Sequence, residues 1–187
     1  AQQRYFVDLV AKKQYYFSGL DAEPQELEHA PSQSSVVDFI LSRSGKRKAI
    51  IYINGSLKSA EFALRLAERR SKVKNDKVED LIKHVREYVH KDYFLGATLK
   101  RGVAFHHGKM PQEVRERVEQ AFADPASPIQ FVVCTSTLLE GVNLPAKNIF
   151  VLSDKHGNST FSKIDFENLA GRAGRLTYDF SGNVVCV

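Results

Sequence analysis

The sequence has few cysteines and no long apolar run, and each shortage excludes a class of protein. Its only cysteines among 187 residues are Cys134 and Cys186. Both lie in strand-like apolar runs, which favours buried free thiols in a reducing compartment over a disulfide. The apolar runs are far too short to cross a bilayer, and the N-terminus has no signal-peptide pattern. We therefore expect an intracellular protein of the cytoplasm, nucleus or nucleoid, with no membrane partner.

Familiar catalytic patterns are missing as well. No GxxxxGK[ST] loop is present to hold the phosphates of a nucleotide. His106 and His107 have no cysteine or carboxylate at ligand spacing, and adjacent residues on an extended chain point to opposite faces, so we expect no metal site there. Cys134 lies in an expected buried strand, where thiols are usually inert. The chain alone thus offers no nucleotide-phosphate loop, no evident metal site and no activated nucleophile.

What the sequence does contain is typical of a globular domain. It is 43% hydrophobic and 26% charged, with a net charge of +5, and its length allows one full core. The positive charge fits a polyanionic partner but does not identify one. The chain ends on the strand-like run 184–187, which we interpret as a sign that it was cut from a longer protein.

Buried strands alternate with amphipathic helices along most of the chain. Continuous apolar runs predict buried strands, and the i, i+3, i+4 spacing of apolar residues predicts helices between them. The expected strands are 49–53, 102–105, 129–134, 148–152 and one from residue 183. The expected helices are 35–42, 58–70, 76–89, 111–122 and 164–173. This alternation predicts an α/β fold with a mostly parallel sheet.

The first 35 residues are expected to be different. Strand-like runs at 4–10 and 14–18, with a turn at Lys12-Lys13, predict an N-terminal β-hairpin. The polar, proline-containing stretch 21–35 predicts a connecting loop. We therefore divide the chain into the hairpin with its loop, 1–35, and the main domain, 36–187.

Three polar stretches directly follow predicted strands. They are Asn54-Gly55-Ser56, His106-His107-Gly108 and Thr135-Ser136-Thr137. Because ligands gather outside the carboxyl ends of strands in an open parallel sheet, we expect the three stretches to share one edge of the sheet. Small hydroxyl and amide groups beside backbone N–H groups suit the phosphate oxygens of a nucleic-acid backbone. Each stretch alone is also ordinary turn chemistry.

The stretch Gly171-Arg172-Ala173-Gly174-Arg175 closes the last expected helix. Its spacing places both arginines on one helical face, and a guanidinium group makes a planar, forked contact with phosphate. Since the chain has no phosphate loop, these arginines would act on a polyphosphate supplied from elsewhere. The alternative is a surface helix with a glycine cap and solvated arginines.

Three segments occurring in order resemble the second RecA-like domain of superfamily 2 DExH-box helicases, in particular the superkiller-like branch. They are FHHG at 105–108, TSTLLEGVNLPA at 135–146 and NLAGRAGR at 168–175, within a resemblance that covers 36–187. The resemblance implies a RecA-like three-layer α/β/α fold and a motor built from two such domains, with ATP between them. It also implies that the missing N-terminal RecA-like domain carries the phosphate loop and holds Mg²⁺. The full-length protein would then be an ATP-dependent helicase, and this chain alone would be inactive.

The resemblance also assigns roles to individual residues. Arg172 and Arg175 match arginine-finger positions, and Gly141 and Asn143 match positions on the ATP side of the cleft. Asn168, also placed on that side, stands where this branch usually has glutamine. The positions matching contacts to RNA or DNA, either single-stranded or an unwinding duplex, are Asn54, Ser56, His107, Gly108, Thr135, Ser136 and Thr137.

A second function remains open. The chain can instead be a non-catalytic α/β module that binds nucleic acid or a protein and keeps degenerate helicase motifs. The intact arginine pair favours the motor, whereas Asn168 and the absence of the other half leave room for the module.

Overall fold

The computed structural model describes residues 3–8, 13–17, 25–27, 36–136, 144, 146–170 and 183–187. The strands are β1 (Gln3–Asp8), β2 (Lys13–Phe17), β3 (Gln25–Leu27), β4 (Ala49–Tyr52), β5 (Val103–His106), β6 (Phe131–Cys134), β7 (Asn148–Val151), β8 (Lys155–His156), β9 (Ser159–Thr160) and β10 (Asn183–Cys186). The helices are α1 (Val36–Ser44), α2 (Ser56–Glu68), α3 (Asp76–Tyr88), α4 (Phe94–Leu99), α5 (Gln112–Ala123) and α6 (Lys163–Ala170).

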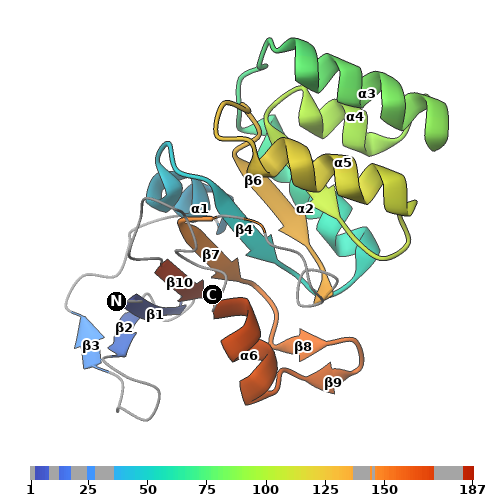
Figure 1. The fold of residues 1–187 in the computed structure, drawn as a ribbon. Coiled ribbons are helices and arrows are strands. Elements are labelled where there is room, and N and C mark those ends of the chain that lie inside the picture. The colour runs from blue at the N-terminus through green and yellow to red at the C-terminus, as the bar shows by residue number, and fades with distance from the viewer. Residues whose placement is uncertain are drawn as a thin grey trace.

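Eight of these strands form one sheet in the order β3-β2-β1-β10-β7-β4-β6-β5. Along the sheet from β1 through β10, β7, β4 and β6 to β5, every neighbouring pair is parallel. The two pairings at the other end, β1 with β2 and β2 with β3, are antiparallel. Helices flank the sheet, with α2 packed on β5 and β6 and α5 packed on β5 (Figure 1). The predicted α/β fold with a mostly parallel sheet is therefore confirmed.

The N-terminal hairpin is present and is joined to the main sheet. β1 pairs antiparallel with β2 and, on its other side, parallel with β10, with Gln3 opposite Asn183. The expectation that 21–35 is entirely loop is wrong at Gln25–Leu27, because this segment pairs with β2 as a third strand. The division of the chain at residue 35 stays a prediction.

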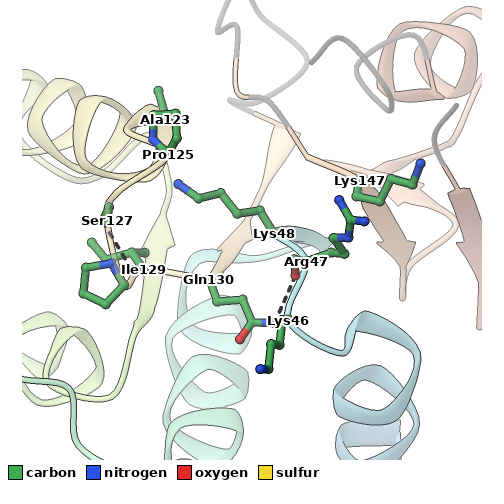
Figure 2. Close-up of a pocket in the computed structure, with 10 residues that line it drawn as sticks. Lys46, Arg47, Lys48, Ala123, Pro125, Ser127, Ile129, Gln130 and Lys147 are labelled. Atoms are coloured by element: carbon green, nitrogen blue, oxygen red, sulfur yellow. Dashed lines mark hydrogen bonds between the residues drawn. The ribbon is translucent and has the colours of Figure 1, made fainter. Parts of the chain in front are cut away.

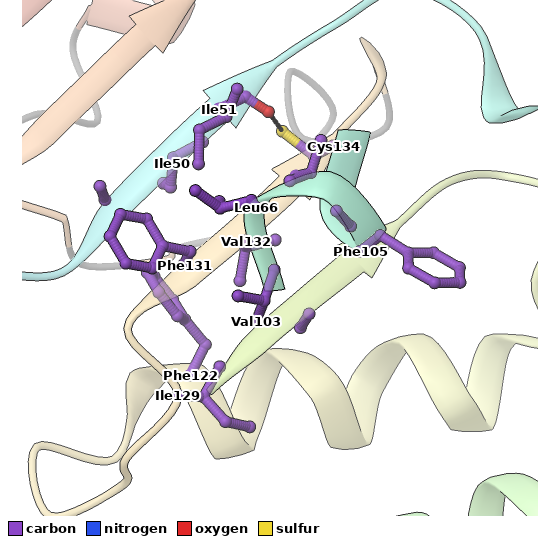
Figure 3. Close-up of a cluster of buried hydrophobic side chains, with 14 of the residues drawn as sticks. Ile50, Ile51, Leu66, Val103, Phe105, Phe122, Ile129, Phe131, Val132 and Cys134 are labelled. Carbon is purple, nitrogen blue, oxygen red and sulfur yellow. Dashed lines mark hydrogen bonds between the residues drawn. The ribbon is translucent and has the colours of Figure 1, made fainter. Parts of the chain in front are cut away.

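The core lies between the central strands and the helices that cover them. All four residues of β4, of β5, of β6 and of β7 are buried, as expected for strands covered on both faces. Figure 3 shows Phe105, Phe122 and Phe131 among the aliphatic side chains of these strands and of α2. Cys134 and Cys186 are thiols rather than a disulfide, as predicted, but only Cys134 is buried and Cys186 is half-buried. The thiol of Cys134 donates to the carbonyl oxygen of Ile51 at 3.5 Å, which joins β6 to β4.

Local sequence explains where several helices begin and end. Asn75 caps α3, since its side-chain oxygen accepts a hydrogen bond from the N–H of Val78 at 3.2 Å. Gly45 follows α1 with φ +53°, a left-handed conformation that suits glycine at a helix end. No helix within the described ranges is long and apolar enough to cross a membrane.

Candidate nucleic-acid interface

The carboxyl ends of β4, β6 and β5 lie next to one another at one edge of the sheet. β6 is between the other two strands, and the last residues Tyr52, Cys134 and His106 stand in register across them. The three polar stretches that follow these strands therefore meet at one edge, as the sequence predicts. We call this the carboxyl edge. The described residues that follow the three strands here, 54–56, 107–108 and 135–136, include no lysine, arginine or carboxylate.

The side chain of Asn54 is hydrogen-bonded to a second hairpin, which the sequence patterns did not predict. Its Nδ2 donates to the carbonyl oxygen of Gly157 at 2.7 Å, and its Oδ1 accepts from the N–H of Gly157 at 3.2 Å. The hydroxyl of Tyr52 donates to the carbonyl oxygen of Lys155 at 2.7 Å. Gly157 has φ +60°, which the turn between β8 and β9 requires. The β8–β9 hairpin is thus held against the end of β4 and adjoins the carboxyl edge.

A sequence signal for this hairpin did exist. Gly157-Asn158 is a typical two-residue hairpin turn, but the flanking strands have only two residues each, too few to show an alternating pattern.

The two histidines of the second stretch face different surroundings. His106 is buried, and its Nε2 lies 2.6 Å from Oε1 of Glu119 on α5. Burial lowers the pKa of His106, although the hydrogen bond to Glu119 acts in the opposite direction. His107 is 7% exposed and stacks on Phe105, with ring centroids 5.7 Å apart. Burial also lowers the pKa of His107, with the neighbouring His106 adding to the effect.

The predicted contact residues at this edge differ in accessibility. Gly108 is exposed, and Ser56 and Ser136 are half-buried. Thr135 is 8% exposed, and its N–H donates to the carbonyl oxygen of His106 at 3.2 Å. Like His107, Thr135 is therefore mostly covered by the protein. The accessible polar groups are those of Gly108, Ser56 and Ser136.

Several predicted site residues lie outside the described part of the chain. They are Thr137, Gly141, Asn143, Arg172 and Arg175. Asn168 is within α6 and its side chain is exposed.

Comparison with known proteins places the chain among helicase domains. Residues 32–177 match a protein family described as the helicase conserved C-terminal domain. Anti-bacteriophage protein B of Escherichia coli K12 is 32% identical over 103 residues, which cover 55% of this chain and 14% of the relative. DNA polymerase theta of Caenorhabditis elegans is 30% identical over 149 residues, covering 72% of this chain and 9% of the relative. The ATP-dependent DNA helicase Hel308 of Aeropyrum pernix is 34% identical over 97 residues, covering 50% of this chain and 13% of the relative.

The chain therefore spans only 9% to 14% of the length of these relatives. The family match, by contrast, runs from α1 through the carboxyl edge and α6, and includes all three polar stretches. With its mostly parallel sheet and flanking helices, this chain belongs to the helicase conserved C-terminal domain family.

Proposed function

We propose that the chain is the C-terminal motor half of an ATP-dependent nucleic-acid helicase of superfamily 2, in the DExH-box, superkiller-like branch. The observation that carries the proposal is the meeting of three polar strand ends at one sheet edge, in a chain that matches a helicase family over 32–177. A relative from Aeropyrum pernix is named an ATP-dependent DNA helicase, which supports the same activity here.

In this proposal the carboxyl edge grips the backbone of RNA or DNA. Its accessible groups at Gly108, Ser56 and Ser136 are neutral, so they bind phosphate oxygens without reading bases. Thr135, which is 8% exposed, and Thr137 are the two further positions that the family resemblance assigns to this contact. Asn54 and His107 support this surface without forming part of it. Asn54 holds the β8–β9 hairpin by hydrogen bonds, and His107 packs against Phe105.

ATP fits this chain only as a ligand shared with another domain. The sequence has no phosphate loop of its own. It offers instead the exposed Asn168, together with Gly141 and Asn143, to a nucleotide held across a cleft. Within the described ranges, no three His, Cys, Asp or Glu side chains gather as a metal site. Following the family resemblance, we assign the phosphate loop and Mg²⁺ to an N-terminal RecA-like domain of the same protein.

The proposed role of Arg172 and Arg175 is that of arginine fingers. ATP, when bound by the other domain, supplies the phosphoryl group that is transferred to water. The two guanidinium groups would stabilise the negative charge that develops during this transfer, an effect worth roughly 10³–10⁵ in rate in related NTPases. Closing the cleft around that charge would move the nucleic-acid-gripping edge.

The test is an ATPase assay on a protein that contains both RecA-like domains. Arg172→Ala or Arg175→Ala should lower kcat by roughly 10³-fold or more, with nucleic-acid affinity nearly unchanged, because a finger acts on the transition state. Lysine should not restore full activity at either position. Arg86→Ala, which alters an exposed arginine of α3, is the matched control.

The 187-residue chain alone should hydrolyse no ATP above background. Robust turnover by this chain would contradict the two-domain proposal. Near-normal turnover of both arginine variants would favour the non-catalytic module.

A further inference from the structure

The edge of the sheet opposite the carboxyl edge contains a basic pocket to which no function is assigned above. Its volume is about 380 Å³. The residues lining it come from the segments that lead into β4, β6 and β7 and from the end of α5: Lys46, Arg47, Lys48, Ala123, Pro125, Ser127, Pro128, Ile129, Gln130 and Lys147. We call this the amino-edge pocket (Figure 2).

The charges that line the amino-edge pocket have one sign. Lys46, Arg47, Lys48 and Lys147 contribute four cations, and no carboxylate is among the lining residues that the structure describes. Asp124, the next residue after α5, carries a carboxylate that accepts a hydrogen bond from Lys77 at 2.8 Å. The pocket therefore gathers four of the chain's 27 lysines and arginines around one cavity.

The basic loop that supplies three of these cations is held in place. Nε2 of Gln130 donates to the carbonyl oxygens of Gly45 and Arg47, at 2.7 and 3.0 Å. The N–H of Arg47 donates to the carbonyl oxygen of Ser44, and the N–H of Lys147 donates to that of Lys48. A loop whose backbone is fixed at these points presents its cations from a set position.

Lys48 plays a different part from the other three cations. Figure 2 shows its side chain crossing the pocket toward Ala123 and Pro125. There its ammonium group donates to the carbonyl oxygens of Phe122 and Asp124, which end α5. Lys48 therefore has a structural role, and its charge contributes to the positive potential of the pocket without a direct contact to a ligand. Lys46 and Arg47 are exposed and Lys147 is half-buried, so these three are placed to meet a ligand.

We propose that the amino-edge pocket binds phosphate groups of a nucleic-acid backbone, as a contact separate from the carboxyl edge. An arginine fork beside two lysines suits closely spaced phosphates. The described lining residues include no aromatic side chain on which a base could stack, which favours a contact with the backbone. The choice of nucleic acid over an acidic protein segment rests on the proposed function.

The test compares two triple variants of the protein in titrations with a fluorescent single-stranded oligonucleotide at several salt concentrations. Lys46→Ala, Arg47→Ala and Lys147→Ala together remove the accessible pocket cations and leave Lys48 in place. The control triple, Arg86→Ala, Lys91→Ala and Arg117→Ala, removes the same charge from exposed positions on or next to α3 and α5. Thermal melting of each variant verifies that it remains folded.

The pocket variant should bind about tenfold or more weakly at 50 mM salt than the unaltered protein. Three lost phosphate contacts should make the slope of log affinity against log salt shallower by about 2. The difference in affinity between the two proteins should therefore shrink toward zero as the salt concentration rises from 50 to 200 mM. The control triple should keep most of the original slope.

Several results would overturn this proposal. One is a pocket variant whose affinity for the oligonucleotide equals that of the unaltered protein, or falls no further than that of the control triple. Another is equal affinity of the unaltered protein for polyglutamate of the same length, which would assign the pocket to an acidic protein segment. Ser136→Ala, tested in parallel, separates the two sites: if it alone weakens binding, the proposed function stands and the pocket assignment fails.

Discussion

The two edges of the sheet differ in chemistry and in how they are built. At the carboxyl edge, residues 54–56, 107–108 and 135–136 offer hydroxyl, amide, imidazole and backbone groups, and the first cation beyond them is the exposed Lys109. At the amino edge, the residues that lead into β4 and β7 bring four cations around one pocket. Both edges can meet phosphate, but by different physics: directed hydrogen bonds on one side and ionic attraction on the other.

This difference teaches that net charge does not locate a binding site. The charge of +5 fits a polyanionic partner, yet the edge selected by motif and topology is neutral at its strand ends. Salt separates the two contributions, because neutralising a phosphate with a cation releases counterions and a neutral hydrogen bond does not.

The largest effect is expected at the amino edge, from Gly102→Ala. Gly102 has φ +70°, and a Cβ there would lie 2.6 Å from the carbonyl oxygen of Pro128, in the wall of the pocket. Strained backbone and the clash together should lower the free energy of unfolding by about 2–3 kcal/mol. Urea denaturation measures this loss.

Gly45→Ala is the matched control for Gly102→Ala. Gly45 has φ +53° but open space around the added Cβ, so only the backbone cost of about 1–2 kcal/mol applies. Equal losses of unfolding free energy in the two variants would mean that the backbone at Pro128 shifts at little cost, so that the pocket does not have a fixed shape.

At the carboxyl edge, Ser136→Ala should weaken nucleic-acid binding without changing its salt dependence. A lost hydrogen bond to a charged phosphate costs about 1.5 kcal/mol, or roughly tenfold in affinity. Because the hydroxyl is neutral, the slope against salt should stay that of the unaltered protein. Ser71→Ala, at an exposed serine after α2, should change neither quantity. A shallower slope for Ser136→Ala would break the distinction between the edges.

A local effect of similar size is expected from Asn54→Ala. Both hydrogen bonds to Gly157 are lost, which should loosen the β8–β9 hairpin by about 1–2 kcal/mol. Amide hydrogen exchange at Gly157 should quicken accordingly, while exchange in β4 stays slow. Asn158→Ala changes the same hairpin but keeps both bonds, so it should leave exchange at Gly157 nearly unchanged. Unaltered exchange in the Asn54 variant would show that Tyr52 alone holds the hairpin.

The smallest effect concerns pH at the carboxyl edge. The pKa values of His106 and His107 are lowered in the folded protein, mainly by burial. The unfolded chain therefore takes up protons first, near pH 6.5, and the stability contributed by the neutral histidines is lost as the pH falls below that value. Urea midpoints at pH 7.5 and 5.5 should differ less in His107→Gln than in the unaltered protein. Equal differences would mean that His107 does not contribute.

Sequence patterns predicted the carboxyl edge because the residues that form it lie next to their strands in the sequence. Each apolar run is followed at once by its polar residues, as at Ile53-Asn54 and Cys134-Thr135, and parallel pairing then brings the strand ends together. The commitment of Asn54 to Gly157 was not predictable, since the two residues are 103 positions apart. The amino-edge pocket was missed for the same reason: Lys147 and Gln130 reach the basic loop only after the sheet has formed.

Besides β8 and β9, two further elements escaped prediction because they are short. α4 has six residues and includes Gly96, so it shows less than two turns of apolar spacing. β3 has three residues within a polar stretch, and only its pairing with β2 makes it a strand.

The parallel pairing of β1 with β10 determines how far the chain can be shortened without exposing an aggregation-prone strand edge. The family match ends at residue 177, before β10, and begins at residue 32, after β3. A protein trimmed to that match would leave β7 with an open row of backbone N–H and C=O groups on the side where β10 now pairs. Such an open edge of a hydrophobic strand is a template for self-association. Retaining residues 3–186 keeps β7 and β10 paired on both sides and leaves only the short strand β3 and the strand β5 at the rims of the sheet.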